Sequence, residues 1–181
     1  MEITLQDNLQ AREHITKVTL ARGIKLGVIG GIAGTLIMDF ILMGALSAVG
    51  LPALTCFSIV GDTVEHLFSN LGIYLAGGVP TGIAAHYLVG PLFGIIFGAS
   101  LVKVDALHVD TLKKGIVLAI LYVEIMSQPI LATTPILLKM TAKDTLLWFG
   151  ASFVMHFLYG VVLGAIVSYG LRLTNHQAIN D

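Results

Sequence analysis

Four ionisable side chains stand within long apolar stretches of the sequence, and their types suit acid–base or metal chemistry. They are Asp39, His86, Glu124 and His156. An acidic group inside a membrane span is energetically costly and normally faces a bundle interior or water. Imidazole changes its charge near neutral pH and is also the commonest metal ligand. We therefore treat these four residues as the candidate functional cluster.

Three kinds of function are compatible with this cluster, and the sequence leaves them open. Carboxylates and histidines in series suit a proton-responsive element or a proton relay. His86 and His156 could instead ligate a haem or a metal ion. In the third interpretation the cluster only hydrogen-bonds helices together, with Thr35, Ser127 and Gln128 as polar neighbours. The chain would then be an accessory subunit of a membrane complex or part of a homo-oligomer.

Enzymatic and nucleic-acid-binding functions find little support in the sequence. No Gly-x-Ser-x-Gly, His-Glu-x-x-His or nucleotide-binding glycine motif occurs. The formal net charge of −1 lacks the basic excess that a phosphate-backbone binder needs. A single cysteine, Cys56, excludes an intrachain disulfide. We expect a non-catalytic protein without a nucleic-acid partner.

The composition predicts that apolar helices position the cluster inside a lipid bilayer. Of 181 residues, 56% are hydrophobic and 12% are charged, and the mean hydropathy is +0.89. Soluble domains contain about 25% charged residues. A spanning helix needs about 20 predominantly apolar residues, and four stretches qualify: 26–51, 81–102, 115–138 and 146–171. The sequence therefore predicts an all-α integral membrane protein whose membrane domain covers residues 26–172.

The basic residues predict the orientation of the spans. Eight of the ten Lys and Arg residues lie in the segment 1–25, in the second loop or just after the last span, and two lie in the third loop. Because cytoplasmic loops carry the excess of Lys and Arg, both termini are expected in the cytoplasm, with the chain in the cytoplasmic membrane. Residues 1–25 are expected to form an amphipathic segment at the membrane surface, and residues 173–181 a cytoplasmic tail.

The first outer loop shows helical periodicity over residues 57–75. Apolar side chains recur at helical spacing, while Asp62, Glu65, His66 and Ser69 fall on the other side. This pattern predicts an amphipathic helix on the outer surface with its acidic face toward water.

An internal repeat relates the second and fourth spans. His86-Tyr-Leu-Val-Gly90-Pro-Leu-Phe-Gly94 matches His156-Phe-Leu-Tyr-Gly160-Val-Val-Leu-Gly164 at an offset of 70 residues. Residues four apart share a helix face, and stripes of small residues let membrane helices approach closely. The residues expected at such contacts are Gly27, Gly31, Gly90, Gly94, Gly98, Gly160 and Gly164. We predict two helical hairpins in a parallel repeat, each pairing a carboxylate helix with a histidine helix.

The third span also resembles a known family. Its segment Glu124-Ile-Met-Ser-Gln-Pro129-Ile-Leu-Ala-Thr-Thr-Pro135 is similar to the corresponding stretch of the YagU-like inner-membrane proteins, which share the Met/Ile-Ser-x-Pro core and the Thr-Pro ending. The family's histidines in the second and fourth spans match His86 and His156. The chain departs from the family at Glu124, where a histidine is expected, and at Asp39, where the family has a basic residue. The resemblance implies a small four-span protein with a link to acid tolerance.

Overall fold

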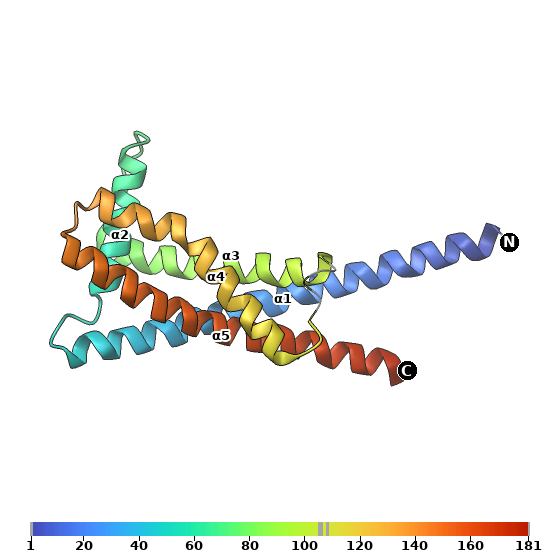
Figure 1. The fold of residues 1–181 in the computed structure, drawn as a ribbon. Coiled ribbons are helices and arrows are strands. Elements are labelled where there is room, and N and C mark those ends of the chain that lie inside the picture. Colours follow the sequence, from blue (N-terminus) through green and yellow to red (C-terminus); the bar gives the residue numbers. More distant parts are fainter. Residues whose placement is uncertain (1, 105–106, 108, 181) are drawn as a thin grey trace.

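The chain folds into five helices that follow one another without an intervening strand in the described part. The computed structural model describes residues 2–180 except 105, 106 and 108, and their side chains between residues 20 and 172. The helices, shown in Figure 1, are α1 (Glu2–Ala48), α2 (Thr55–Ser69), α3 (Gly78–Lys103), α4 (Leu112–Leu137) and α5 (Ala142–Asn180). The predicted surface segment 1–25 and the tail 173–181 fall largely outside the described side chains.

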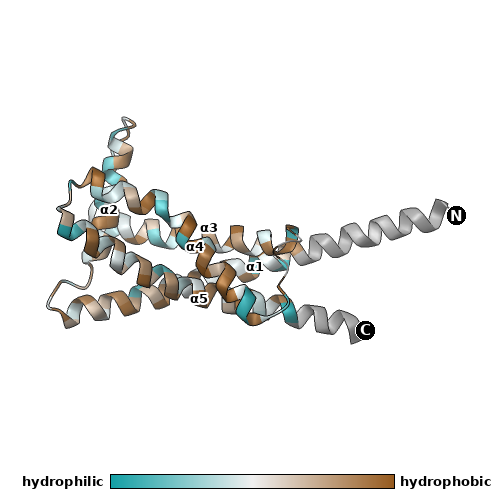
Figure 2. Ribbon diagram, in the orientation of Figure 1, coloured by the Kyte–Doolittle hydropathy of each residue, from teal (hydrophilic) through white to brown (hydrophobic). Residues whose placement is uncertain are grey.

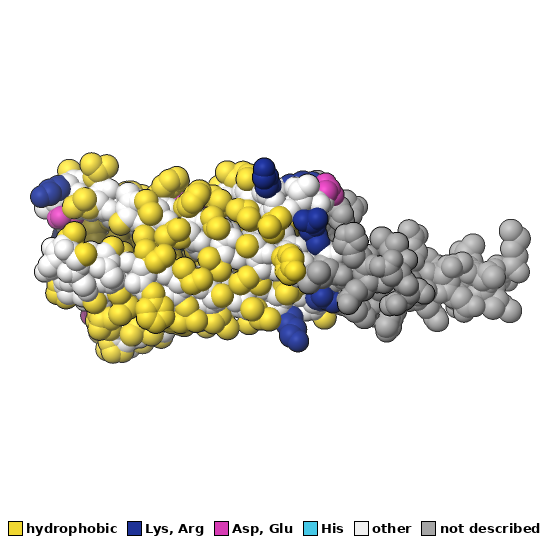
Figure 3. All heavy atoms as spheres, turned by 90° about the horizontal axis from the view of Figure 1, so that it is seen from below, with side chains coloured by type: hydrophobic (Ala, Val, Ile, Leu, Met, Phe, Trp, Pro, Cys, Tyr) yellow, Lys and Arg dark blue, Asp and Glu magenta, His cyan; other side chains and the backbone are white. Residues whose placement is uncertain are grey.

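Four of these helices are long and apolar enough to cross a membrane. The candidate spans are Leu20–Ala48, Gly78–Lys103, Leu112–Leu137 and Ala142–Arg172. Apolar residues predominate along these helices (Figure 2), and in the space-filling view basic side chains lie at the two ends of an apolar band (Figure 3). Side chains such as Phe40, Leu88 and Ile136 are exposed on this band, where lipid rather than water would surround them. The predicted all-α membrane fold is confirmed.

Helix α1 has a central position in the bundle. It packs along both α3 and α5, while α4 packs along α5 and meets α3 at only a few residues. The fully buried side chains Leu163 and Val167 of α5 lie in the core, together with Val123 of α4. We call the end that carries Lys103, Leu112 and Arg172 the terminal end, and the opposite end, where α2 crosses the bundle in Figure 1, the α2 end.

Glycines bring α1 and α3 into backbone contact over three turns. A Cβ added at Gly27 would clash with the carbonyl of Gly94, and the pairs Gly23–Gly98 and Gly31–Gly90 meet in the same way. Any side chain at these positions would push the helices apart, which explains why small residues recur here at every fourth position. Gly27, Gly31, Gly90, Gly94 and Gly98 thus all lie at the α1–α3 contact.

In the second hairpin, formed by α4 and α5, the histidine helix α5 also carries a stripe of small residues, but the residues of α4 that face it are larger. Gly160 and Gly164 of α5 lie against the backbone of Ile120 and Ile116 of α4. At the terminal end the roles exchange, because Gly115 of α4 faces Ser168 of α5. The two hairpins therefore share one packing scheme in which a small-residue stripe receives the neighbouring helix.

The contacts set the register between the hairpins. An offset of 70 residues relates Gly90 of α3 to Gly160 of α5. Because Gly90 contacts Gly31 of α1 and Gly160 contacts Ile120 of α4, an offset of 89 residues relates α1 to α4. On this register Asp39 corresponds to Gln128, and Glu124 corresponds to Thr35. The carboxylates of Asp39 and Glu124 are therefore offset by one helical turn between the two hairpins.

Helix α2 is shorter and more deeply packed than its amphipathic pattern predicts. It ends at Ser69 rather than near Leu75, because Asn70 caps it and Gly72 follows with φ +77°, a conformation that glycine adopts readily. Gly61 packs against the backbone of Gly78, and the Thr63 hydroxyl donates to that of Thr134 on α4 at 3.2 Å. The helix thus fills the space between α3 and α4 at the α2 end.

The acidic side of α2 is only partly turned to water. The Asp62 carboxylate accepts a hydrogen bond from the backbone N–H of Gly78 at 2.8 Å, and the Glu65 carboxylate lies beside Gly77. Gly77 is the N-cap of α3, where the helix dipole favours negative charge. Asp62 is half-buried and anchors the start of α3, whereas Glu65, His66 and Ser69 are exposed as expected of a solvated face.

Candidate functional site

The site is centred on a buried pair between α1 and α3. Nδ1 of His86 lies 3.1 Å from Oδ1 of Asp39, and the side chains are 17% and 5% exposed. The glycine contact between Gly31 and Gly90 lies about two turns and one turn away from them along the helices. It holds the two backbones close enough for short side chains to meet across the interface. A hydrogen bond at this atom requires the imidazole proton on Nδ1 when the carboxylate is ionised.

Thr35 supports the helix contact rather than the carboxylate. Its hydroxyl donates to the carbonyl of Gly31 at 2.9 Å, within its own helix. The same hydroxyl packs over the backbone of Gly90, and Thr35 is buried. Oδ2 of Asp39 is buried without a hydrogen-bond partner among the described residues. Tyr87 of α3, next to His86, also interacts with this carboxylate.

Helix α2 covers the pair from the α2 end. The ring of Phe57 meets the His86 ring edge-on, with centroids 5.2 Å apart, and its backbone packs against Gly82, one turn before His86. Cys56, next to Phe57, lies within electrostatic range of the Asp39 carboxylate. Burial, and to a smaller extent this negative charge, raise the pKa of the Cys56 thiol to about 12. The imidazole and carboxylate are therefore enclosed by α1, α2 and α3.

His156 lies near this pair, on α5. It is within electrostatic range of His86, and its Nδ1 is buried without a hydrogen-bond partner among the described residues. One turn further along α5, the buried Tyr159 donates its hydroxyl to the carbonyl of Gly90 at 2.5 Å. Its ring lies against Gly34 of α1. The α5 side of the site is thus tied to both α1 and α3.

None of the described contacts links Glu124 to the other three residues of the predicted cluster. Both of its carboxylate oxygens are buried without a hydrogen-bond partner among the described residues. Ser127 and Gln128 do bond to Glu124, but to its backbone carbonyl, at 3.2 Å and 3.1 Å. The structure therefore brings Asp39, His86 and His156 together, and gives Glu124 a separate place on α4.

Of the groups in the site, the imidazoles suit both a metal ion and a haem. A carboxylate bonded to Nδ1 of His86 leaves Nε2 as the ligand atom, as in many metal sites. Within the described residues, however, no group of three or more His, Cys, Asp or Glu side chains is placed to hold a metal ion. The Phe57 ring packs against the His86 ring, and the Tyr159 hydroxyl reaches the carbonyl of Gly90, one turn after His86. These residues do not fit a macrocycle between them.

Sequence reasoning missed the contribution of α2 to the site. Phe57 was expected only as part of an apolar face, and Cys56 entered only as the single cysteine that excludes an intrachain disulfide. The relevant indication was Gly82, which continues the small-residue stripe of α3 past His86. In the structure this position receives α2 instead of α1.

Comparison with known proteins adds no relative. No protein-family model, no curated protein and no solved structure matches the chain. The resemblance to the YagU-like proteins stays a prediction.

Proposed function

We propose that the chain is a non-catalytic, multi-pass protein of the cytoplasmic membrane that responds to protons through the Asp39–His86 pair. The 3.1 Å contact between Nδ1 and Oδ1, buried beneath α2, is the observation that supports this proposal. The excess of Lys and Arg at the terminal end supports cytoplasmic termini. The pair would then lie in the outer half of the membrane, where external acidification reaches it first.

The groups around the pair explain how protonation would change the structure. Protonated His86 would pair with the Asp39 carboxylate, but it would also place a positive charge near His156. Protonation of the Asp39 carboxylate as well would remove the negative charge that stabilises protonated His86. Because Phe57 and Cys56 pack around this pair, such changes act on the contact between α2 and the bundle. Buried charges that lose a partner are costly, so loosening of α2 is the expected response.

Accessibility of the single cysteine tests this proposal in proteoliposomes. The reaction of Cys56 with 4,4′-dithiodipyridine, which remains reactive with thiols in acid, should accelerate when the outer medium is acidified. The variants Asp39→Asn and His86→Gln should remove this acceleration while retaining their helical circular dichroism. Glu124→Gln is the matched control, because Glu124 lies outside the pair, and it should behave as the parent does. A Cys56 rate that follows pH identically in all four proteins would rule the proposal out.

A role as an accessory subunit is the second candidate, supported by apolar side chains that project at the α2 end. Leu71, Ile73 and Tyr74 are exposed in the segment between α2 and α3, and Tyr74 is 97% exposed. A partner helix or subunit at this position would cover them. Stoichiometric co-purification from native membranes that is lost in Leu71→Ser/Tyr74→Ser would support this role. Leu146→Ser, at an exposed position in the spans, is the control and should retain the partner.

A further inference from the structure

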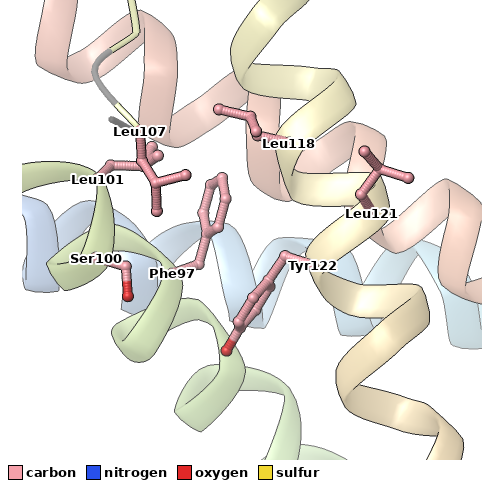
Figure 4. Close-up of a pocket in the computed structure, with 7 residues that line it drawn as sticks. All are labelled: Phe97, Ser100, Leu101, Leu107, Leu118, Leu121 and Tyr122. Atoms are coloured by element: carbon pink, nitrogen blue, oxygen red, sulfur yellow. The ribbon is translucent and has the colours of Figure 1, made fainter. Parts of the chain in front are cut away.

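A groove between α3 and α4 lies toward the terminal end, away from the Asp39–His86 pair. The two helices meet around Tyr122, whose hydroxyl donates to the carbonyl of Phe93 at 3.2 Å and whose ring lies 5.4 Å from that of Phe97. Beside this contact is a cavity of about 240 Å³ (Figure 4). The cavity exists because α4 packs along α5 and scarcely along α3.

The lining of the groove is almost wholly apolar. Its residues come from α3, α4 and the loop between them: Phe97, Ser100, Leu101, Leu107, Leu118, Leu121 and Tyr122. Leu101 is buried at its base, whereas Leu121 is 54% exposed at its rim. A water molecule needs two to four polar partners in such a site, and the Tyr122 hydroxyl is already bonded. The groove is therefore suited to hydrocarbon from the surrounding bilayer.

Basic side chains stand one turn from the groove, on the same helix faces. Lys103 follows Ser100 by three residues, and Lys114 precedes Leu118 by four, spacings that place each pair on one face. Both lysines are exposed, as is Lys113. Asp110 offsets part of this charge through its 3.3 Å contact with Lys114. Among the described residues, Lys103 and Lys114 thus stand near the groove, together with the Asp110 carboxylate.

We propose that this groove binds one anionic phospholipid, with an acyl chain along Leu118 and Leu121 and its phosphate near Lys103 and Lys114. Long lysine side chains at span ends reach the headgroup level, and each basic residue near the surface attracts anionic lipid. The apolar groove accounts for the chain, and the lysines account for the headgroup. This site is independent of the proposed proton response, because it uses none of the same residues.

Quenching of a local tryptophan by brominated lipids tests the proposal on the full chain. Leu121→Trp in a Trp148→Phe background places the only tryptophan on the groove rim. Val117→Trp in the same background is the matched control, since Val117 is also 54% exposed on α4 but does not line the groove. Both variants are reconstituted with phosphatidylglycerol and phosphatidylcholine of identical acyl chains, and bromine is carried by one lipid at a time.

We expect brominated phosphatidylglycerol to quench the tryptophan at position 121 more than brominated phosphatidylcholine does. The binding constant of phosphatidylglycerol relative to that of phosphatidylcholine should be on the order of threefold or more. Lys103→Gln/Lys114→Gln should abolish this preference, and position 117 should show none. Native mass spectrometry of the unsubstituted chain should retain one phosphatidylglycerol in preference to phosphatidylcholine. Equal quenching by the two lipids at position 121, or a preference that survives the lysine substitutions, would overturn the proposal.

Discussion

His86 of α3 lies with Nδ1 3.1 Å from Oδ1 of Asp39 on α1, and this buried contact joins the two helices that pack most closely through glycine. The pair is therefore a structural contact as well as the proposed proton-responsive site. Its energetic contribution can be separated from that of the glycine interface, because different substitutions remove each.

Removing the Asp39 carboxylate should destabilise the bundle. In Asp39→Ala the imidazole N–H loses its acceptor in a buried place, and a lost buried partner costs about 1–3 kcal/mol. We expect the free energy of unfolding, measured by denaturant titration in mixed micelles, to fall by this amount. A double-mutant cycle with His86→Ala isolates the pair. Single-mutant losses that simply add in the double variant would contradict a direct interaction.

The glycine interface predicts opposite effects at two positions of α1. A methyl group at Gly27 would clash with the carbonyl of Gly94, whereas one at Gly44 would meet nothing within 4 Å. Gly27→Ala should therefore destabilise the fold, by about 1–3 kcal/mol for an overpacked contact. Gly44→Ala should be neutral or stabilising by up to about 1 kcal/mol, because alanine favours the helix. The same unfolding titration measures both, and equal effects would refute the α1–α3 contact.

The spans and their pairing could be predicted from sequence because both depend on local patterns. Apolar length defines a membrane helix, and small residues at every fourth position mark the face that meets a neighbour. The observed span Gly78–Lys103 differs from the predicted 81–102 by only a few residues. The same patterns led to the expectation that a carboxylate helix pairs with a histidine helix, as Asp39 and His86 do.

The register and the role of α2 could not be predicted in this way. A stripe with a four-residue period looks the same after a shift by one turn, so the sequence does not distinguish Gln128 from Glu124 as the residue that corresponds to Asp39. The depth of α2 depends on tertiary contacts, such as Gly61 against Gly78, that no local pattern encodes. Phe57 and Cys56 therefore entered the site only when the structure placed α2 over it.

The packed position of α2 can be tested by a disulfide. The hydroxyls of Thr63 and Thr134 are 3.2 Å apart, so cysteines at these positions should oxidise to a bond between α2 and α4. We expect Thr63→Cys/Thr134→Cys in a Cys56→Ser background to cross-link, which proteolysis followed by non-reducing electrophoresis detects. Ser69→Cys/Thr134→Cys is the control, because Ser69 is exposed at the end of α2. Equal cross-linking of both pairs would argue against the packed arrangement.

The reactivity of Cys56 should report the Asp39 charge. Burial and that negative charge raise the pKa of the thiol to about 12, and the thiolate is the reactive form. Asp39→Asn removes one of the two causes, so the pKa falls, more thiolate forms at a given pH and alkylation becomes faster. The rate of reaction with iodoacetamide at mildly alkaline pH measures this effect. Glu124→Gln should leave the rate unchanged; an equal acceleration there would mean that the effect is not local to Asp39.

Glu124 should reveal whether an isolated intramembrane carboxylate lowers stability. Its two oxygens are buried without a described partner, and an unsatisfied buried polar group costs about 1–3 kcal/mol. Glu124→Leu should therefore raise the free energy of unfolding by this amount, because leucine has no polar group to desolvate. Glu124→Gln should change it little, since the amide needs partners as well. A loss of stability in Glu124→Leu would instead indicate that the carboxylate has a binding partner, and lipid or a second subunit would be the next candidates.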